Sequence, residues 1–304
     1  MTKLVLIDGN AIMHRAYHAL PKTLTSKNKK PINAVYGFVS MLLRIIQDLA
    51  PSHLAVAFDR KEPTFRHEQF KDYQAHRPEM DDELSEQFEV VKKVITSFGI
   101  PIYEKAGFEA DDVIGTIAFS VVRSLSAVDS VVIVTGDRDM LQLVTDKINL
   151  YMPGRSLTDA TLYGPKETKK KMGVVPSQIV DYKALVGDPS DNYPGVKGIG
   201  PKTAENLLKK FNNLDNIYAN LDQIENKTAK LLKDSKDMAY KSQKLAEIAT
   251  TVPETSFDLD DANDWGLGRQ EIIETFDEIG FKTLKQRVNA LAIKNKDSNQ
   301  MELV

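Results

Sequence analysis

Short, wholly apolar runs recur along the first half of the chain, and polar residues follow each of them. The three clearest are residues 4–7, 54–58 and 131–134, and two weaker ones lie near residues 101–104 and 148–152. Runs of this kind are typical of strands that are buried on both faces of a parallel sheet. The pattern therefore predicts a series of buried strands.

Segments with helical spacing separate these runs. Apolar residues recur every three or four positions over residues 34–49 and 84–98, and again after Glu109. Alternating strands and helices predict an α/β fold with a mostly parallel central sheet flanked by helices. Beyond about residue 175 the sequence becomes helical and rich in lysine, which predicts an additional helical part.

The composition narrows the class of protein. The chain has 304 residues, of which 42% are hydrophobic and 27% charged, and a net charge of −3, as in ordinary globular proteins. The absence of cysteine excludes disulfides and thiolate metal sites. No apolar run approaches the length of about 18 residues that a membrane span needs, and no signal-peptide pattern is present. We therefore expect a cytoplasmic protein without membrane contact.

Acidic residues cluster after the apolar runs. Because ligands of open parallel sheets bind at the carboxyl ends of the strands, we expect these acids at one edge of the sheet, together with others from loops. The candidates are Asp8, Asp59, Glu109, Asp111, Asp112, Asp137, Asp139, Asp188 and Asp191. A single aspartate after a strand is usually a turn or capping residue, and an acidic start at Glu109 also suits the dipole of a helix. Acids that follow three separate strands favour a shared site.

Carboxylates crowded into a partly desolvated site repel one another and become protonated unless cations neutralise them. Without cysteine or a histidine cluster, the oxygen ligands point to Mg²⁺ or Mn²⁺. Two such ions about 4 Å apart can hold the attacking and leaving oxygens of a phosphodiester. The sequence thus predicts a site for two Mg²⁺ or Mn²⁺ ions.

Residues 60–83 mix cationic and aromatic side chains and lack a continuous apolar stripe. Channels for single-stranded nucleic acid have this composition, although charged amphipathic helices are commoner. The segment follows Asp59 directly, so Arg66 and Arg77 are candidates to hold a scissile phosphate against the metal ions.

A glycine-rich segment, residues 195–200, lies in the lysine-rich part. A nucleotide-binding loop would need a preceding strand, where this chain has a proline, Pro194. A tight turn between two short helices fits better, with Pro201 at the first helical position. The backbone at Gly195, Gly198 and Gly200, with Lys197 and Lys202, can then hold phosphates of a duplex, as in a helix-hairpin-helix. The alternative is a structural turn with solvated lysines.

Several of these motifs together resemble one family. They are Leu-Ile-Asp8-Gly-Asn, Ala-Phe-Asp59, Phe65-Arg66-His67-Glu68, Gly107-Phe-Glu109-Ala-Asp111-Asp112, Gly136-Asp137-Arg-Asp139 and Gly187-Asp188-Pro-Ser-Asp191-Asn192. Over about residues 1–290 the chain resembles the 5′ nuclease (flap endonuclease-like) superfamily, most closely the N-terminal 5′→3′ exonuclease domain of bacterial DNA polymerases I.

The resemblance implies a domain organisation. We expect a PIN-like, metal-dependent nuclease core over residues 1–185, a helical DNA-binding subdomain with the helix-hairpin-helix over residues 186–293, and a polar, frayed tail over residues 294–304. Within the core, a helical arch over about residues 60–83 would be threaded by a 5′ single strand. The resemblance further implies that the acids bind two metal ions and that the hairpin binds K⁺.

Arch residues Lys71, Tyr73 and Gln74 are expected to contact DNA. The family usually has a lysine after the arch tyrosine, where this chain has Gln74. The phosphate contact is therefore missing here, or Arg77, Lys71 or Arg138 supplies it.

The function predicted is that of a structure-specific 5′→3′ exonuclease and flap endonuclease in DNA replication and repair, acting as a monomer in flap and primer removal. Its substrates would be 5′ flaps, nicked or gapped duplexes and RNA/DNA hybrids. One alternative is a non-catalytic, structure-specific DNA-binding module. Another is a phosphatase with Asp8 as its nucleophile, but that chemistry requires a second aspartate where this chain has Asn10.

Overall fold

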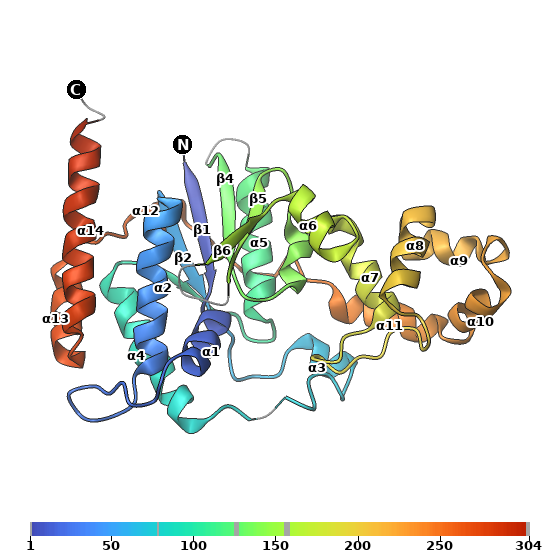
Figure 1. Ribbon diagram of the computed structural model, residues 1–304, viewed down its shortest axis with the longest axis horizontal. Coiled ribbons are helices and arrows are strands. Elements are labelled where there is room, and N and C mark those ends of the chain that lie inside the picture. Colours follow the sequence, from blue (N-terminus) through green and yellow to red (C-terminus); the bar gives the residue numbers. More distant parts are fainter. Residues whose placement is uncertain (1, 78, 125–127, 155–158, 302–304) are drawn as a thin grey trace.

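A six-stranded sheet forms the centre of the computed structural model, which describes residues 2–77, 79–124, 128–154 and 159–301, with side chains as far as residue 294 (Figure 1). The strand order is β3-β2-β1-β4-β5-β6. The strands are β1 (Lys3–Asp8), β2 (His53–Ala57), β3 (Ile102–Tyr103), β4 (Ser130–Val134), β5 (Ile148–Pro153) and β6 (Ala160–Tyr163).

The first five strands run parallel, as the sequence predicted, and β6 pairs antiparallel with β5 at the edge. Successive residues of β1 alternate between two hydrophobic cores. Leu4 and Leu6 pack into one core, while Val5 and Ile7 pack into the other. Both faces are therefore covered, which explains why the strands read as uninterrupted apolar runs.

Helices surround the sheet and continue beyond it. They are α1 (Gly9–Ala19), α2 (Asn33–Leu49), α3 (Phe65–Gln69), α4 (Asp82–Ser97), α5 (Ala110–Arg123), α6 (Pro165–Met172), α7 (Ile179–Val186), α8 (Pro201–Phe211), α9 (Leu214–Ala219), α10 (Asn226–Asp234), α11 (Lys236–Ala246), α12 (Leu259–Asn263), α13 (Gln270–Ile279) and α14 (Lys282–Met301). Three 3₁₀ turns complete the set of described helices: η1 (Asp139–Leu143), η2 (Pro176–Gln178) and η3 (Leu221–Gln223).

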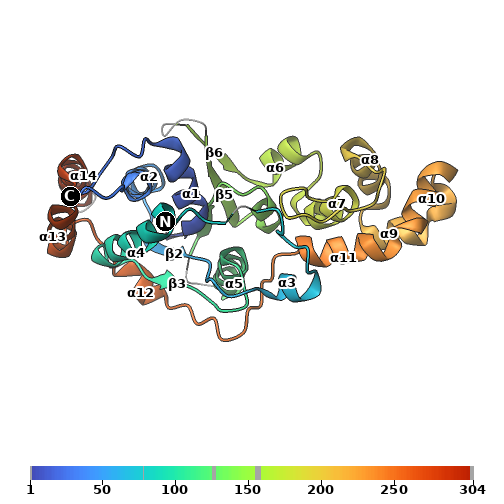
Figure 2. The ribbon, with the colours of Figure 1, turned by 90° about the horizontal axis from the view of Figure 1, so that it is seen from below.

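The two faces of the sheet carry different helices. Helices α1, α2 and α4 cover one face, and α5 packs on the other. Figure 2, seen from below, places α1, α2 and α5 around the strands in this way. The α5 face continues into the helices after α6, because buried residues such as Ile179 and Leu208 belong to the same core as Ile114. This shared core crosses the boundary expected near residue 185, so the division into two domains stays a prediction.

The last two helices return to the sheet. Helices α13 and α14 pack against α4 and α2, and Arg287 Nη1 donates to Ser40 Oγ at 3.1 Å. Phe276 and Leu284 are buried in the same core as Val35. Residues 270–288 therefore lie with the sheet rather than with the lysine-rich helices. Helix α14 continues to Met301, and the polar, frayed tail expected from residue 294 stays a prediction.

Helix α1 and strand β6 were not expected, and the helical arch is smaller than expected. Helix α1 begins directly after β1, and Asp8 caps it by accepting a hydrogen bond from the Ala11 N–H at 2.9 Å. The edge strand β6 is short and largely exposed, so it lacks the apolar signature of the others. In residues 60–83, only α3 and the start of α4 are helical, and turns, bends and irregular structure make up the rest of the described segment. No helix among the described residues is both long and apolar enough to cross a bilayer.

Candidate active site

A cavity of about 440 Å³ opens at the carboxyl ends of β1, β2 and β4. Seven of the nine predicted acids line it: Asp8, Asp59, Glu109, Asp111, Asp137, Asp139 and Asp191. Residues 60–83 run along the lower edge of the molecule in Figure 1, below these strand ends. The structure thus brings together acids that lie far apart in the sequence.

Hydrogen bonds hold three of these carboxylates, those of Asp8, Asp59 and Asp137, in fixed orientations. Asp8 Oδ2 accepts a hydrogen bond from Thr135 Oγ1 at 2.6 Å, which ties the end of β1 to the end of β4. Asp59 Oδ1 accepts from the Ala110 N–H at 2.7 Å, which ties β2 to the first turn of α5. Asp137 Oδ1 accepts from the Asp139 N–H at 2.8 Å. Each carboxylate keeps lone pairs that these bonds do not use, and all three residues line the cavity.

Burial makes the charged forms of these acids unfavourable. Desolvation, followed by the other carboxylates, raises the pKa of Asp8 and of Asp139 to about 7. Desolvation also raises the pKa of Glu109 to about 7, and the positive charge of Arg66 opposes this rise. The pKa of Asp111 lies well above its ordinary value for the same reasons, burial first and then Asp8 and Asp137. A cation would relieve this unfavourable charge, as expected for a metal site.

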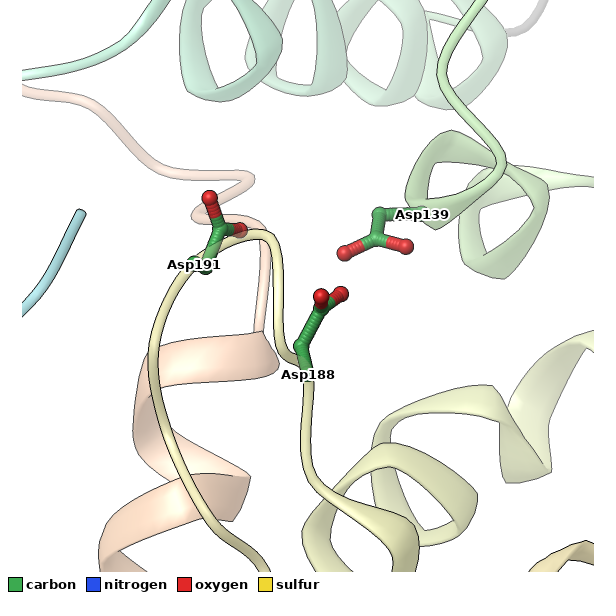
Figure 3. Close-up of side chains that lie close together, drawn as sticks. All are labelled: Asp139, Asp188 and Asp191. Carbon is green, nitrogen blue, oxygen red and sulfur yellow. The ribbon is translucent and has the colours of Figure 1, made fainter. Parts of the chain in front are cut away.

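Asp139, Asp188 and Asp191 form a second group at the rim of the cavity (Figure 3). Each offers a carboxylate oxygen, and these oxygens lie within 4.8 Å of one another. Asp139 belongs to η1, whereas Asp188 and Asp191 lie in the loop between α7 and α8. Figure 3 shows the three side chains converging on a common space.

A lysine that sequence reasoning missed lies in this group. The ammonium of Lys183, on α7, lies 2.5 Å from Asp139 Oδ1 and also pairs with Asp188. The carboxylates raise the pKa of Lys183 in opposition to burial, and Lys183 helps to lower the pKa of Asp188. The only sequence signal was a lysine one helical turn before an acidic loop, and that pattern is too common to single it out.

Arg66 and Asp112 lie differently from expectation. Arg66 is 2% exposed, and its guanidinium pairs with both oxygens of Asp112, at 2.7 and 2.8 Å. Its other N–H groups donate to Glu109 and to the carbonyl oxygens of Leu245 and Glu247. All five donors of the guanidinium therefore have an acceptor within the protein. A phosphate contact by Arg66, as predicted, would require breaking this network.

Asp112 is fully buried and does not line the cavity. Besides Arg66, its oxygens accept from the backbone N–H groups of Glu109 and Ala249. The carboxylate holds the first turn of α5 and the segment after α11 in place. Its geometry therefore supports a structural role, and its binding of a metal ion, directly or through water, stays a prediction.

The residues predicted to contact a single strand lie near the acids. Arg77 is half-exposed and its Nη2 lies 2.8 Å from Asp191 Oδ1. Gln74 donates to the same oxygen at 3.1 Å. Tyr73 is buried, and its hydroxyl lies 3.4 Å from Glu109 Oε2, while Lys71 is exposed.

Beside the cavity, a groove of about 920 Å³ joins the acid group to cationic side chains. Its cationic lining residues are Arg15, Arg77, Arg138 and Lys183, and His18 lines it as well. Arg15 and His18 come from α1, which was not predicted, so they were missed as well. A groove lined by both acids and cations can hold a phosphate backbone across a metal site.

The glycine segment precedes α8. Gly195 and Gly198 have φ angles of 61° and 88°, and Gly200 precedes Pro201, the first residue of α8. Lys197 and Lys202 are exposed. The turn is longer than predicted, because α7 ends at residue 186 and a bridge between Asp188 and Tyr193 comes before the glycines. The acid loop and the glycine segment are therefore parts of one connection.

The donor set of the site fits divalent cations. Every candidate ligand is a carboxylate, which is the chemistry that Mg²⁺ and Mn²⁺ prefer. Tyr193, in the same loop as Asp188 and Asp191, is 2% exposed, and its hydroxyl has no hydrogen-bond partner among the described residues. Burial and the charges of Asp139 and Asp188 raise the pKa of this hydroxyl.

Several solved structures share this fold. The chain matches the flap endonuclease of bacteriophage T5, solved as a pseudo-enzyme-product complex with DNA and metal ions, with a TM-score of 0.67, 21% identity and coverage of 95% of this chain and 97% of the other. It matches flap endonuclease-1 from Methanococcus jannaschii with a TM-score of 0.60, 16% identity and coverage of 97% and 93%. The architecture is thus the 5′ nuclease fold.

The chain belongs to the 5′-3′ exonuclease family, whose members are hydrolases that act on DNA. Residues 3–173 match the model of its N-terminal resolvase-like domain, and residues 174–266 match the model of its C-terminal SAM fold. This confirms the predicted family and fold class.

Relatives include two DNA polymerases I. The one from Bacillus caldotenax is 40% identical over 289 residues, which are 95% of this chain and 32% of the relative. The one from Bacillus subtilis (strain 168) is 38% identical over 301 residues, which are 99% of this chain and 34% of the relative. The chain therefore spans about a third of the length of these relatives.

Proposed function

We propose that the chain is a structure-specific 5′→3′ exonuclease and flap endonuclease that hydrolyses phosphodiesters with two divalent metal ions. One observation carries the proposal: seven carboxylates from separate elements line a single cavity that continues into a cationic groove. Family membership supports the reaction class. The substrates proposed are 5′ flaps, nicked or gapped duplexes and RNA/DNA hybrids, processed by a monomer in the cytoplasm during DNA replication and repair.

The acids divide by position into two groups that could each hold an ion. Asp8, Asp59, Glu109, Asp111 and Asp137 lie around the inner cavity, and Asp139, Asp188 and Asp191 lie at its rim. When bound, Mg²⁺ or Mn²⁺ supplies positive charge for the leaving oxygen and lowers the pKa of a water molecule that attacks phosphorus. The carboxylates hold the ions in place, and the hydrogen bonds from Thr135 and Ala110 fix two of those carboxylates.

Cationic side chains orient the phosphate in this proposal. Arg77 lines both the cavity and the groove and is exposed enough to exchange Asp191 for a phosphate oxygen. Lys183, on α7, also lines the groove, and so does Arg138, which lies between Asp137 and Asp139 in the sequence. Because Arg66 is saturated by its own partners, it acts through Asp112 and Glu109 and not on the substrate.

The remaining predicted contacts hold DNA on either side of the cavity. Lys71, Tyr73 and Gln74 belong to the segment that would meet the single strand. Gly195, Gly198 and Gly200, together with Lys197 and Lys202, would hold duplex phosphates without reading sequence, with K⁺ as a further ion at this turn. The exposed position of both lysines supports this assignment.

The test is a flap duplex labelled at its 5′ end, incubated with the protein in Mg²⁺ or in EDTA, with products sized on a gel. Short labelled products in Mg²⁺ and their absence in EDTA are expected. A non-catalytic DNA-binding module would bind the junction in EDTA and yield no product in Mg²⁺. A phosphatase would release inorganic phosphate from a 5′-phosphorylated end without cutting the chain, and either result would contradict the proposal.

A further inference from the structure

Gln74 and Asp191 are joined through both backbone and side chain. The Gln74 N–H donates to the backbone carbonyl of Asp191 at 3.0 Å, and Gln74 Nε2 donates to Asp191 Oδ1 at 3.1 Å. A third bond joins the same two segments, since Asn192 Nδ2 donates to the carbonyl of Asp72 at 2.7 Å. Residues 72–77 are thus docked onto the loop that carries Asp188 and Asp191.

Two residues at this contact have an unfavourable backbone. Gln74 and Asn192 have φ angles of 55° and 59°, in the left-handed region that residues other than glycine rarely adopt. Each of them forms bonds across the contact. Strained backbones of this kind persist where surrounding contacts hold them, and they are enriched at functional sites. The docking is therefore a specific arrangement.

The bonds to the Asp191 carboxylate all reach one of its oxygens. Gln74 Nε2 and Arg77 Nη2 both lie close to Oδ1, at 3.1 and 2.8 Å. No described residue donates a hydrogen bond to Oδ2. Two donors on one oxygen fix the rotation of the carboxyl group, and the second oxygen stays available for a cation. Gln74 helps to fix this rotation without adding a positive charge, whereas Arg77 partly neutralises the Asp191 carboxylate.

We propose that Gln74 is a positioning residue that orients Asp191 for a divalent cation. The cation would bind at the rim site, formed by Asp139, Asp188 and Asp191, and its binding would be coupled to the docking of residues 72–77. The inference rests on the proposed function, because it takes Asp139, Asp188 and Asp191 as cation ligands. It assigns to the glutamine a role different from that of a phosphate-binding cation. By linkage, a cation at the rim site favours the docked segment to the same degree as the docked segment favours the cation.

The backbone conformation of Gln74 dictates the choice of variant. Gln74→Gly removes the amide and keeps a residue that tolerates a positive φ, so it separates the side chain from backbone strain. Gln74→Lys keeps a donor but places a positive charge beside Asp191. Gln69→Ala is the control, since Gln69 is an exposed glutamine of the same segment.

The first measurement is Mn²⁺ binding to the full chain without DNA, followed by electron paramagnetic resonance. Loss of residues that orient metal ligands typically weakens metal binding about 10- to 100-fold. We expect Gln74→Gly to weaken the rim site about tenfold, Gln74→Lys to weaken it at least as much, and Gln69→Ala to leave it unchanged. An unchanged Mn²⁺ affinity in Gln74→Gly would overturn the inference.

The second measurement is flap cleavage as a function of Mg²⁺ concentration. Gln74→Gly should need about tenfold more Mg²⁺ for half-maximal rate, and excess Mg²⁺ should restore most of the lost rate. A lowered kcat that excess Mg²⁺ does not restore would show direct action on the substrate and contradict a positioning role. Lack of cleavage by the wild type with intact Mn²⁺ binding would refute the proposed function alone.

Discussion

Arg66 and Asp112 form a two-pronged ion pair in the interior, with Nη1–Oδ2 and Nη2–Oδ1 distances of 2.7 and 2.8 Å. The pair joins α3, which follows β2, to the first turn of α5. Through the same guanidinium, the carbonyl oxygens of Leu245 and Glu247 attach the end of α11. Three segments that enclose the acidic cavity therefore depend on one side chain.

Replacing Arg66 with alanine should destabilise the protein strongly. The change leaves the buried Asp112 carboxylate without its partner, and breaking such a pair typically costs about 3–5 kcal/mol. Urea unfolding followed by circular dichroism measures the loss. Arg123→Ala is a suitable control, because Arg123 is exposed on α5. Similar unfolding midpoints for the two variants would show that the buried pair contributes little.

Replacing Arg77 with alanine should affect turnover and leave stability nearly unchanged. The side chain is 54% exposed, and the proposal places it on the scissile phosphate. Loss of one preorganised charge donor typically lowers kcat about 10²-fold. Single-turnover cleavage of a flap duplex at saturating enzyme tests this. A wild-type rate would remove Arg77 from the catalytic machinery.

Replacing Asp137 with alanine should abolish cleavage and leave DNA binding largely intact. Asp137 lines both the cavity and the groove, close to Asp139. Removing one carboxylate weakens cation binding but leaves the exposed Lys197 and Lys202 unchanged. Flap cleavage and fluorescence anisotropy of the same substrate separate the two effects. Turnover near that of the wild type in Mg²⁺ would contradict the assignment of Asp137.

Without divalent cations, stability should fall as the pH rises. The pKa values of Asp8 and Asp139 rise from an ordinary 3.8 to about 7 in the folded protein. Between these values the folded state binds more protons than the unfolded state, so the free energy of unfolding decreases with increasing pH. Above the pKa that these two acids have in the folded protein, their contribution to the free energy of unfolding is completely lost.

The melting temperature in EDTA should therefore be lower near pH 8 than near pH 6, by several degrees, since 1 kcal/mol shifts it by about 2–4 °C in a large domain. Mg²⁺ should raise it more at the higher pH, because it binds the ionised acids. Asp8→Asn, which cannot ionise, should show a smaller decrease. Equal melting temperatures for the wild type in EDTA at the two pH values would contradict this account.

Two glycines of the turn before α8 should respond differently to alanine. At Gly195, with a φ of 61°, an added Cβ would overlap the backbone of Gly187, whereas at Gly200 it would meet open space. Gly195→Ala should therefore lower the free energy of unfolding by about 1–3 kcal/mol, and Gly200→Ala should change it by less than about 0.5 kcal/mol. Urea unfolding compares them. A stable Gly195→Ala variant would mean that the connection can rearrange.

The sheet and the gathering of the acids followed from the sequence because both depend on local patterns. Apolar runs gave the parallel strands, and the position of Asp8, Asp59 and Asp137 after those runs implied a common edge. The burial of Arg66 could not be read in this way, since its partners lie up to 181 residues away. Lys183 was missed for the same reason, because its role depends on how α7 meets η1.

The return of α13 and α14 to the sheet was also hidden from local reasoning. Their apolar stripes predict helices, but nothing in the spacing says which surface they cover. Tyr193 illustrates a further limit, because an unpaired hydroxyl is visible only once the residues around it are placed. Secondary structure could be predicted because neighbouring residues determine it. The packing of helices and the partners of buried side chains could not, because contacts between distant segments decide them.

The packing of α13 and α14 on α2 and α4 affects how the protein folds during synthesis. Their residues lie beyond residue 266, where the family match ends, yet Phe276 and Leu284 complete a core that includes Val35. A nascent chain leaving the ribosome would thus expose the apolar surface of its earliest helices until α13 and α14 emerge. A fragment cut at the end of the family match would keep that surface exposed and tend to aggregate.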